Sequence, residues 1–110
     1  MTVNLVYITT GSQAEARAIG RALIEDRLAA CVNLIGGMRS LYRWEGRIQE
    51  DPEIVLIAKT TESRVAALIA KVEALHSYDC PCIVCLPVVG GSADFLDWVV
   101  DEVAEKSGFA

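Results

Sequence analysis

The sequence lacks the features that mark several classes of protein. Its 110 residues include one His and three Pro, with no run of Lys or Arg, and fifteen acidic against ten basic residues give a net charge of −5. Such a chain has no basic patch with which to hold a phosphate backbone. The longest apolar run, residues 82–89, contains a Pro and is far shorter than the roughly 20 residues that span a bilayer. We expect neither a nucleic-acid partner nor membrane insertion.

The first residues also lack the basic start, the longer apolar core and the small-residue cleavage site of a secretory signal. We therefore expect a cytoplasmic protein. In the cytosol structural disulfides are disfavoured, so the cysteines should be reduced thiols used for packing, metal binding or redox chemistry. These cysteines are Cys31, Cys80, Cys82 and Cys85.

Apolar residues, in contrast, are abundant and make up 53% of the chain. The length predicts a single domain covering residues 1–110. A domain of this size buries only about two thirds of the surface that its unfolded chain exposes. The apolar surplus therefore predicts an oligomer.

The pattern of apolar residues predicts an alternation of strands and helices. Ser12 stands three residues before Glu15, which is the spacing of a helix-capping box. Gly36-Gly37 favours a bend or bulge, Glu45-Gly46 favours a tight turn, and Pro52 restricts its segment to a sheet edge or a bulge. The expected elements are a strand at 3–9, a helix at 13–27, a long β-hairpin, a helix at 61–76, a buried strand at 82–86 and a helix at 92–103. The first arm of the hairpin covers 30–35 and 38–44, and the second arm covers 47–49 and 54–58.

This order is β-α-β-β-α-β followed by one further helix. It is typical of the α+β ferredoxin-like sandwich, in which an antiparallel sheet carries its helices on one face. The other face of the sheet then needs cover, which again favours association of several chains.

Five segments, in this order along the chain, closely resemble the CutA divalent-cation tolerance family. They are residues 28–33, 40–48, 53–60, 76–81 and 91–98. The resemblance implies a ferredoxin-like subunit in a tight homotrimer, with long hairpins that pair between subunits. It also implies kinship in architecture to the trimeric PII signalling proteins, which bind small effectors in clefts between subunits. Members of the family have been linked to copper tolerance and metal binding.

The sequence departs from the family at positions that bear on metal binding. Some bacterial members carry a Cys in the first strand and a doubled His, where this chain has Ile8 and Leu75 before His76. The copper site proposed for those members is therefore largely missing. Cys80-Pro81-Cys82 stands where the family usually has Val-Pro-Glu, and Phe95 replaces a Tyr.

One His and three Cys lie within ten residues, as His76-x3-Cys80-x-Cys82-x2-Cys85. Such soft ligands suit Cu(I) or Zn(II). In a regular strand Cys80 and Cys82 share a face while Cys85 points to the other, so the candidate metal ligands are His76, Cys80 and Cys82. The alternative is that Cys82 and Cys85 are small core residues and that His76 caps a helix C-terminus.

A second candidate site concerns a small anionic effector. Lys59, Thr60 and Thr61 end a strand and begin a helix, where free backbone N–H groups and a Lys suit an anion; an ordinary Thr cap beside a solvated Lys is the alternative. The aromatic residues Tyr42, Trp44 and Trp98 could line an inter-subunit cleft with Glu53. Their alternative role is simple packing at the trimer interface.

Enzymatic activity lacks support in the sequence. The loop at residues 9–13 has no Arg to hold a phosphate, and Cys31 has no general base near it in the sequence. The leading interpretation is a non-enzymatic homotrimer that acts in divalent-cation (copper) tolerance, with Cu or Zn as its candidate metals. The alternatives are a PII-like module that binds a small anionic effector between subunits, and a trimeric scaffold for a partner protein.

Overall fold

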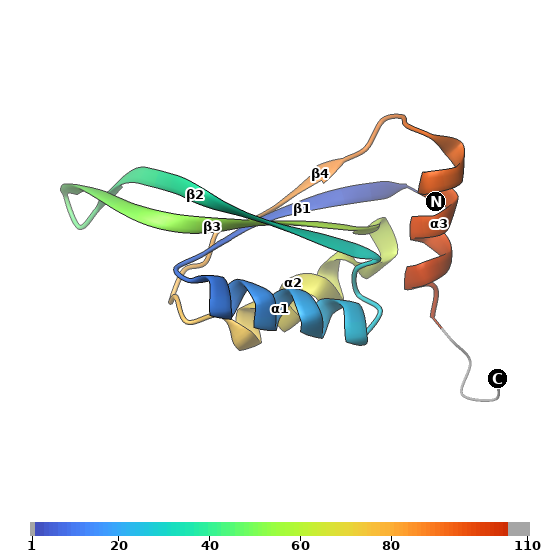
Figure 1. The fold of residues 1–110 in the computed structure, drawn as a ribbon, viewed down its shortest axis with the longest axis horizontal. Helices are drawn as coiled ribbons and strands as arrows, with labels where there is room; N and C mark the ends of the chain where they lie inside the picture. Colours follow the sequence, from blue (N-terminus) through green and yellow to red (C-terminus); the bar gives the residue numbers. More distant parts are fainter. Residues whose placement is uncertain (1, 106–110) are drawn as a thin grey trace.

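The computed structural model describes residues 2–105, whose four strands form one antiparallel sheet in the order β2-β3-β1-β4 (Figure 1). This arrangement confirms the predicted α+β ferredoxin-like fold with an additional C-terminal helix. The elements are β1 (Val3–Thr10), α1 (Gln13–Glu25), β2 (Cys31–Trp44), β3 (Arg47–Thr61), the 3-10 helix η1 (Glu62–Arg64), α2 (Val65–Leu75), β4 (Ile83–Pro87) and α3 (Ala93–Val103).

Helices α1 and α2 cover the same face of the sheet, and α3 stands at the end of the sheet away from the hairpin tip (Figure 1). Alternate residues of a strand point to the same face, so the even-numbered apolar residues of β1 and β3 meet the apolar stripes of the helices. Each such side chain contributes roughly 1.5–3 kcal/mol by leaving water. The fully buried members include Val6, Ile8, Ile19, Leu23, Leu56 and Leu68.

The start of α1 confirms the predicted cap, because the backbone N–H of Glu15 donates to Oγ of Ser12 at 3.2 Å. The helix ends at Glu25, two residues before the predicted end at residue 27. Arg27 has a φ of 56°, and this left-handed conformation terminates the helix. The predicted helix at 61–76 is likewise shorter, since the chain passes through η1 before α2 begins at Val65.

Strands β2 and β3 form the predicted long hairpin, with the expected bulge at Gly36-Gly37. The pairing moves from Ile35–Val55 to Met38–Glu53, so β2 carries one extra residue there. Gly37 has a φ of 82°, which a glycine adopts at little cost.

The far part of the hairpin, residues 38–53, projects beyond the rest of the sheet as a two-stranded ribbon (Figure 1). Strand β1 pairs with β3 only as far as Ile54. Pro52 therefore pairs with Arg39 of β2 on one side and with no described strand on the other. Because a proline cannot donate a ladder hydrogen bond, this position confirms the prediction that Pro52 lies at an edge.

The face of the sheet opposite α1 and α2 is largely uncovered. Strand β4 pairs only with β1, and its Val84 and Leu86 are 50% and 53% exposed. The prediction of a buried strand here is therefore wrong for the single chain, because β4 is an edge strand and no described element covers this side of it. Helix α3 covers only one end of the face, where Nζ of Lys59 lies 6.0 Å from the centre of the Phe95 ring. None of the helices within residues 2–105 has the length and apolarity that crossing a membrane requires.

Candidate functional site

A groove of about 680 Å³ lies where the ribbon leaves the sheet. One wall comes from the ribbon, the floor from the end of β1, and the other wall from the loop that precedes β4. The lining residues are Tyr7, Thr9, Ser40, Leu41, Tyr42, Trp44, Asp51, Glu53, Tyr78, Asp79, Cys80 and Cys82.

The bulge in β2 directs the ribbon side chains into this groove. One extra residue in a strand reverses the side on which the following side chains point. Beyond Gly37, the even-numbered residues of β2 share a face with the odd-numbered residues of β3, as the pairing of Ser40 with Asp51 shows. Tyr42 and Trp44 therefore lie on the same side of the ribbon as Asp51 and Glu53.

Three hydrogen bonds fix the start of the loop that forms the other wall. Nε2 of His76 lies 2.7 Å from the carbonyl oxygen of Thr9, and the backbone N–H of Tyr78 donates to Nδ1 of His76 at 3.1 Å. The backbone N–H of Ser77 donates to a carboxylate oxygen of Glu15 at 2.9 Å. The loop is thereby held against the end of β1, and the residues after Tyr78 border the groove.

The groove carries carboxylates without a matching positive charge. Its lining includes Asp51, Glu53 and Asp79 and no Lys, Arg or His. Glu53 is only 9% exposed, and its Oε2 accepts a hydrogen bond of 3.0 Å from the hydroxyl of Tyr78. The hydroxyl of Tyr42 donates to Oδ2 of Asp51 at 2.6 Å.

These carboxylates raise the pKa of the groups beside them. Burial, followed by the hydrogen bond to Glu53 and its negative charge, raises the pKa of Tyr78 to about 12. The hydrogen bond to Asp51 raises the pKa of Tyr42. Burial and the charge of Glu53 raise the pKa of the Cys82 thiol. The groove is thus a site of negative potential, in which the phenols and this thiol keep their protons at neutral pH.

The structure does not assemble His76, Cys80 and Cys82 into a metal centre. Since Tyr78 donates to Nδ1 of His76, the ring proton is on Nε2, which donates to Thr9; neither ring nitrogen has a free lone pair for a metal. Cys80 and Cys82 do border the same groove. Within residues 2–105, no three His, Cys, Asp or Glu side chains are grouped closely enough to hold a metal ion.

The alternative interpretation of these residues holds in part. The backbone N–H of His76 donates to the carbonyl of Val72 at 2.8 Å, and His76 is the C-cap of α2. Cys82 and Cys85, however, are exposed rather than packed in the core of the single chain. Cys85 pairs with Val6, on the face opposite the groove, as strand geometry predicts.

The candidate effector residues divide between three places. Tyr42, Trp44 and Glu53 line the groove. Thr60 is fully buried on the helix side of the sheet. Its neighbour Lys59 points to the opposite face, where its Nζ donates to Oδ1 of Asn33. The two side chains therefore cannot contact one ligand together. Trp98 lies on α3, with its ring centre 5.7 Å from that of Phe95. The side chains of Lys59 and Thr60 therefore do not form one site, and an anion site at the backbone N–H groups of residues 59–61 stays a prediction.

Sequence reasoning missed several residues of the groove. Alternation along the hairpin identifies Asp51 once the bulge is placed, because Asp51 and Glu53 are two residues apart. Tyr78 and Asp79 come from a loop without periodicity, so nothing in the sequence places them opposite the ribbon. The missed lining residues are Tyr7, Thr9, Ser40, Leu41, Asp51, Tyr78 and Asp79.

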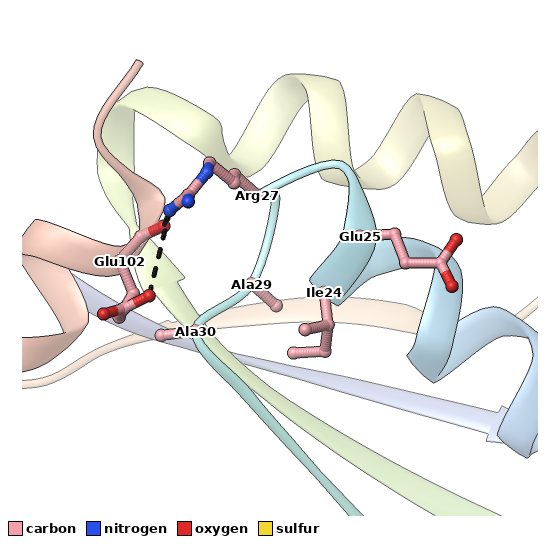
Figure 2. Close-up of a pocket in the computed structure, with 6 residues that line it drawn as sticks. All are labelled: Ile24, Glu25, Arg27, Ala29, Ala30 and Glu102. Atoms are coloured by element: carbon pink, nitrogen blue, oxygen red, sulfur yellow. Dashed lines mark hydrogen bonds and ion pairs between the residues drawn. The ribbon is translucent and has the colours of Figure 1, made fainter. Parts of the chain in front are cut away.

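A second hollow, of about 220 Å³, lies between the end of α1 and α3 (Figure 2). Arg27 closes it by donating from Nη1 to the backbone oxygen of Glu102 at 3.0 Å, and the same atom lies 3.8 Å from the Glu102 carboxylate. Glu25 points away from this pair in Figure 2. The charged groups at this hollow thus pair with each other and join the segment after α1 to α3. Few polar groups remain there to hold a ligand.

Comparison with known proteins decides the family of this chain. Residues 4–102 match the family model described as "CutA1 divalent ion tolerance protein". The chain belongs to the CutA1 family. It is 47% identical over 95 residues to the Thermus thermophilus "Divalent-cation tolerance protein CutA", which covers 86% of this chain and 92% of that relative. It is 42% identical over 102 residues to the protein of the same name from Archaeoglobus fulgidus, covering 93% of this chain and 98% of the relative.

Solved structures of CutA1 proteins share the fold. The structure of CutA1 from Oryza sativa superposes with a TM-score of 0.93 at 38% identity, covering 96% of this chain and 97% of that chain. The names of relatives indicate different locations, since one Oryza sativa relative is named chloroplastic and the protein in the Archaeoglobus fulgidus structure is named periplasmic. The chain spans 58% of the length of that chloroplastic relative. A cytoplasmic location for this CutA1 chain stays a prediction.

Proposed function

We propose that this CutA1 chain acts in divalent-cation tolerance as a homotrimer and catalyses no reaction. The names of its relatives, "Divalent-cation tolerance protein CutA", support the role in tolerance. The observation that carries the assembly is the uncovered sheet face opposite α1 and α2. Its apolar residues are Leu5, Tyr7, Ile35, Ile57, Val84 and Leu86.

Two properties of this face favour association. Each Å² of apolar surface removed from water stabilises a complex by roughly 25 cal/mol before the costs of association. In addition, β4 is an edge strand, and the ribbon at residues 38–53 has only two strands. Unpaired edges and isolated two-stranded ribbons gain stability from a further strand. A second and third copy of the chain would supply both kinds of contact.

A substitution on the open face tests the assembly. Leu86→Lys places a charge in the proposed interface, and we expect sedimentation velocity to show smaller species than for the parent chain. Leu75→Lys is the matched control, because Leu75 is similarly exposed, at 45%, but lies at the end of α2. If Leu86→Lys sediments as the parent does across a dilution series, the interface is not on this face.

Cys80 and Cys82 are the residues proposed to hold a soft cation such as Cu or Zn. They border one groove with the carboxylates of Glu53 and Asp79, and thiolates suit both metals. One chain does not complete the ligand set in the part that the structure describes. The proposal therefore requires a further ligand from a second subunit or from solution. The two hydrogen bonds of the His76 ring favour a structural role for this residue.

Equilibrium dialysis of the reduced protein against Zn(II) tests this proposal. The double variant Cys80→Ser/Cys82→Ser should bind less metal per chain than the parent. Cys85→Ser, a change of another exposed thiol outside the groove, should bind as the parent does. Unchanged binding in the double variant would remove the thiols from the proposal and leave the assembly untouched.

The alternative of a PII-like anion-binding module receives less support from this groove, because its carboxylates repel an anion. The scaffold alternative is also a trimer, which would present its hairpins to a partner protein. A trimer that binds no Zn(II) in the dialysis experiment would favour the scaffold.

A further inference from the structure

Lys59 is a half-buried lysine that pairs with no carboxylate in the part of the chain that the structure describes. None of the ion pairs within residues 2–105 includes it. Its Nζ instead donates to Oδ1 of Asn33 and, over 3.5 Å, to Sγ of Cys31. A partly buried charge is normally met by an opposite charge. Here the ammonium group is held against a neutral amide and a thiol.

The sheet itself fixes the contact between Lys59 and Cys31. The two residues are directly opposite each other in the pairing of β2 with β3, and the backbone N–H of Ala30 donates to the carbonyl oxygen of Lys59 at 2.8 Å. Opposite residues of antiparallel strands have their Cβ atoms about 4.5–5.5 Å apart on one face. The centre of the Phe95 ring on α3 lies 6.0 Å from Nζ. The thiol and the amine therefore stay close without a bound ligand.

This environment distinguishes Cys31 from the other cysteines. Among the described residues, it is the one thiol whose sulfur accepts a hydrogen bond from a lysine. The other three cysteines are exposed, whereas Cys31 is half-buried. The pair lies at the end of the sheet that α3 covers (Figure 1). Because both groups belong to one chain, a reaction between them needs no space for a ligand on the open face.

A thiol beside an amine can form a sulfur–nitrogen bond when a peroxide is present. Peroxides oxidise cysteine to the sulfenic acid, which condenses with a backbone nitrogen to a sulfenamide; a lysine amine is a stronger nucleophile than an amide nitrogen. We propose that hydrogen peroxide converts Cys31 and Lys59 to an intramolecular sulfenamide, with a covalent bond between Sγ and Nζ. This bond protects Cys31 from further oxidation to the sulfinic acid, which thiols do not reverse.

The reaction has two balanced steps. Sγ of Cys31 attacks one peroxide oxygen, the O–O bond breaks, and the thiol proton leaves with the other oxygen as water; sulfur loses two electrons and the peroxide gains them. Lys59 gives its extra proton to solvent, and the neutral amine attacks Sγ. The S–N bond forms, the S–O bond breaks, and the hydroxyl leaves with an amine proton as a second water. Dithiothreitol reverses the product to thiol and amine and becomes a cyclic disulfide.

Mass spectrometry of a chain with one thiol tests the proposal. The variant Cys80→Ser/Cys82→Ser/Cys85→Ser leaves Cys31 as the only cysteine, so no disulfide can form within a chain. The full-length variant is treated with a small excess of hydrogen peroxide in EDTA and digested without reductant. We expect a product that lacks two hydrogen atoms of the parent mass, a proteolytic fragment that joins residues 31 and 59, and return of the parent mass with dithiothreitol.

Two lysine variants of this one-thiol chain identify the amine. Lys59→Arg keeps the positive charge but removes the amine, so we expect loss of the crosslink and capture of the sulfenic acid by dimedone. Lys71→Arg changes a lysine whose Nζ pairs with Asp26 at 3.0 Å; it is the control and should form the crosslink in the same yield. Circular dichroism checks the fold of each variant. If Lys59→Arg is unfolded, the joined fragment from the one-thiol chain still identifies the two residues.

Three results would overturn the proposal. The first is a Cys31 that peroxide leaves unchanged or converts to the sulfinic acid without the product that lacks two hydrogen atoms. The second is an equal yield of that product in folded Lys59→Arg, which would assign the nitrogen to the backbone. The third is a product that forms only between two chains, as a disulfide of two Cys31 residues. None of these results depends on metal binding, which EDTA prevents.

Discussion

Tyr78 and Glu53 are 25 residues apart in the sequence, yet the Tyr78 hydroxyl donates a hydrogen bond of 3.0 Å to Oε2 of Glu53. This bond joins the loop before β4 to the base of the projecting ribbon. Among the described residues, it is also the one side-chain hydrogen bond of a carboxylate that is 9% exposed. This pair of side chains therefore connects the two walls of the groove.

Removing this hydroxyl should destabilise the fold. Tyr78→Phe keeps the ring and leaves the Glu53 carboxylate without its donor, which typically costs about 1–3 kcal/mol in the free energy of unfolding. Urea unfolding followed by circular dichroism measures the loss. Tyr42→Phe is the control, because its acceptor Asp51 is exposed and solvent can replace the bond. Equal losses in both variants would show that burial of Glu53 is not what makes the Tyr78 bond important.

The raised pKa of Tyr78 predicts a loss of stability at alkaline pH. Its pKa is about 12 in the folded chain against an ordinary 10.0, so the folded state holds this proton more strongly than the unfolded state does. The associated stability is fully present below pH 10 and is lost as the pH rises to about 12. Urea unfolding at several pH values in this window should show a smaller decline in Tyr78→Phe. A variant that declines as steeply as the parent would exclude Tyr78 as the titrating group.

Thr60→Val should stabilise the protein. The Thr60 hydroxyl is buried and has no hydrogen-bond partner among the described residues, and such a group costs about 1–3 kcal/mol relative to a satisfied one. Valine has nearly the same shape without the hydroxyl, so we expect a gain of about 1 kcal/mol. Thr61→Val is the matched control, because the Thr61 hydroxyl lies 3.2 Å from that of Ser63 and the variant loses this contact. A loss of stability in Thr60→Val would mean that its hydroxyl has a partner after all.

Glu45→Asn should stabilise the ribbon. Glu45 and Gly46 have φ values of 51° and 77°, the conformation of a two-residue hairpin turn that favours Asn-Gly. Asparagine adopts this conformation more readily than glutamate, so we expect a gain of less than about 1 kcal/mol. Thermal unfolding and amide hydrogen exchange along the ribbon measure it. Gly46→Ala should act in the opposite direction, and a stabilised Gly46→Ala would contradict the turn geometry.

Local patterns in the sequence predict most of the fold. The Ser12 cap, the Gly36-Gly37 bulge and the edge position of Pro52 each depend on the chemistry of one or two residues, and all three are confirmed. The exposure of β4 could not be predicted in this way. Its apolar run is the same whether a helix of the same chain or another molecule covers it, so the sequence does not distinguish a core strand from an interface strand.

The site was less predictable than the fold. Strand alternation correctly predicts that Cys80 and Cys82 share a face, and both border the groove. The two hydrogen bonds of the His76 ring, in contrast, depend on tertiary structure and have no sequence signal. Lys59 and Thr60 are adjacent in a strand, and strand geometry alone directs their side chains to opposite faces. The sequence alone therefore indicates that these two side chains do not contact one ligand together on the same face of the sheet.

Native mass spectrometry of the reduced, untagged protein tests the central claim of a homotrimeric CutA1 assembly most directly. The proposed homotrimer predicts a species with three times the mass of the 11.9 kDa chain, which persists on dilution and is weakened by Leu86→Lys on the open sheet face. A spectrum that contains only the single chain over the same concentration range would contradict the proposed assembly.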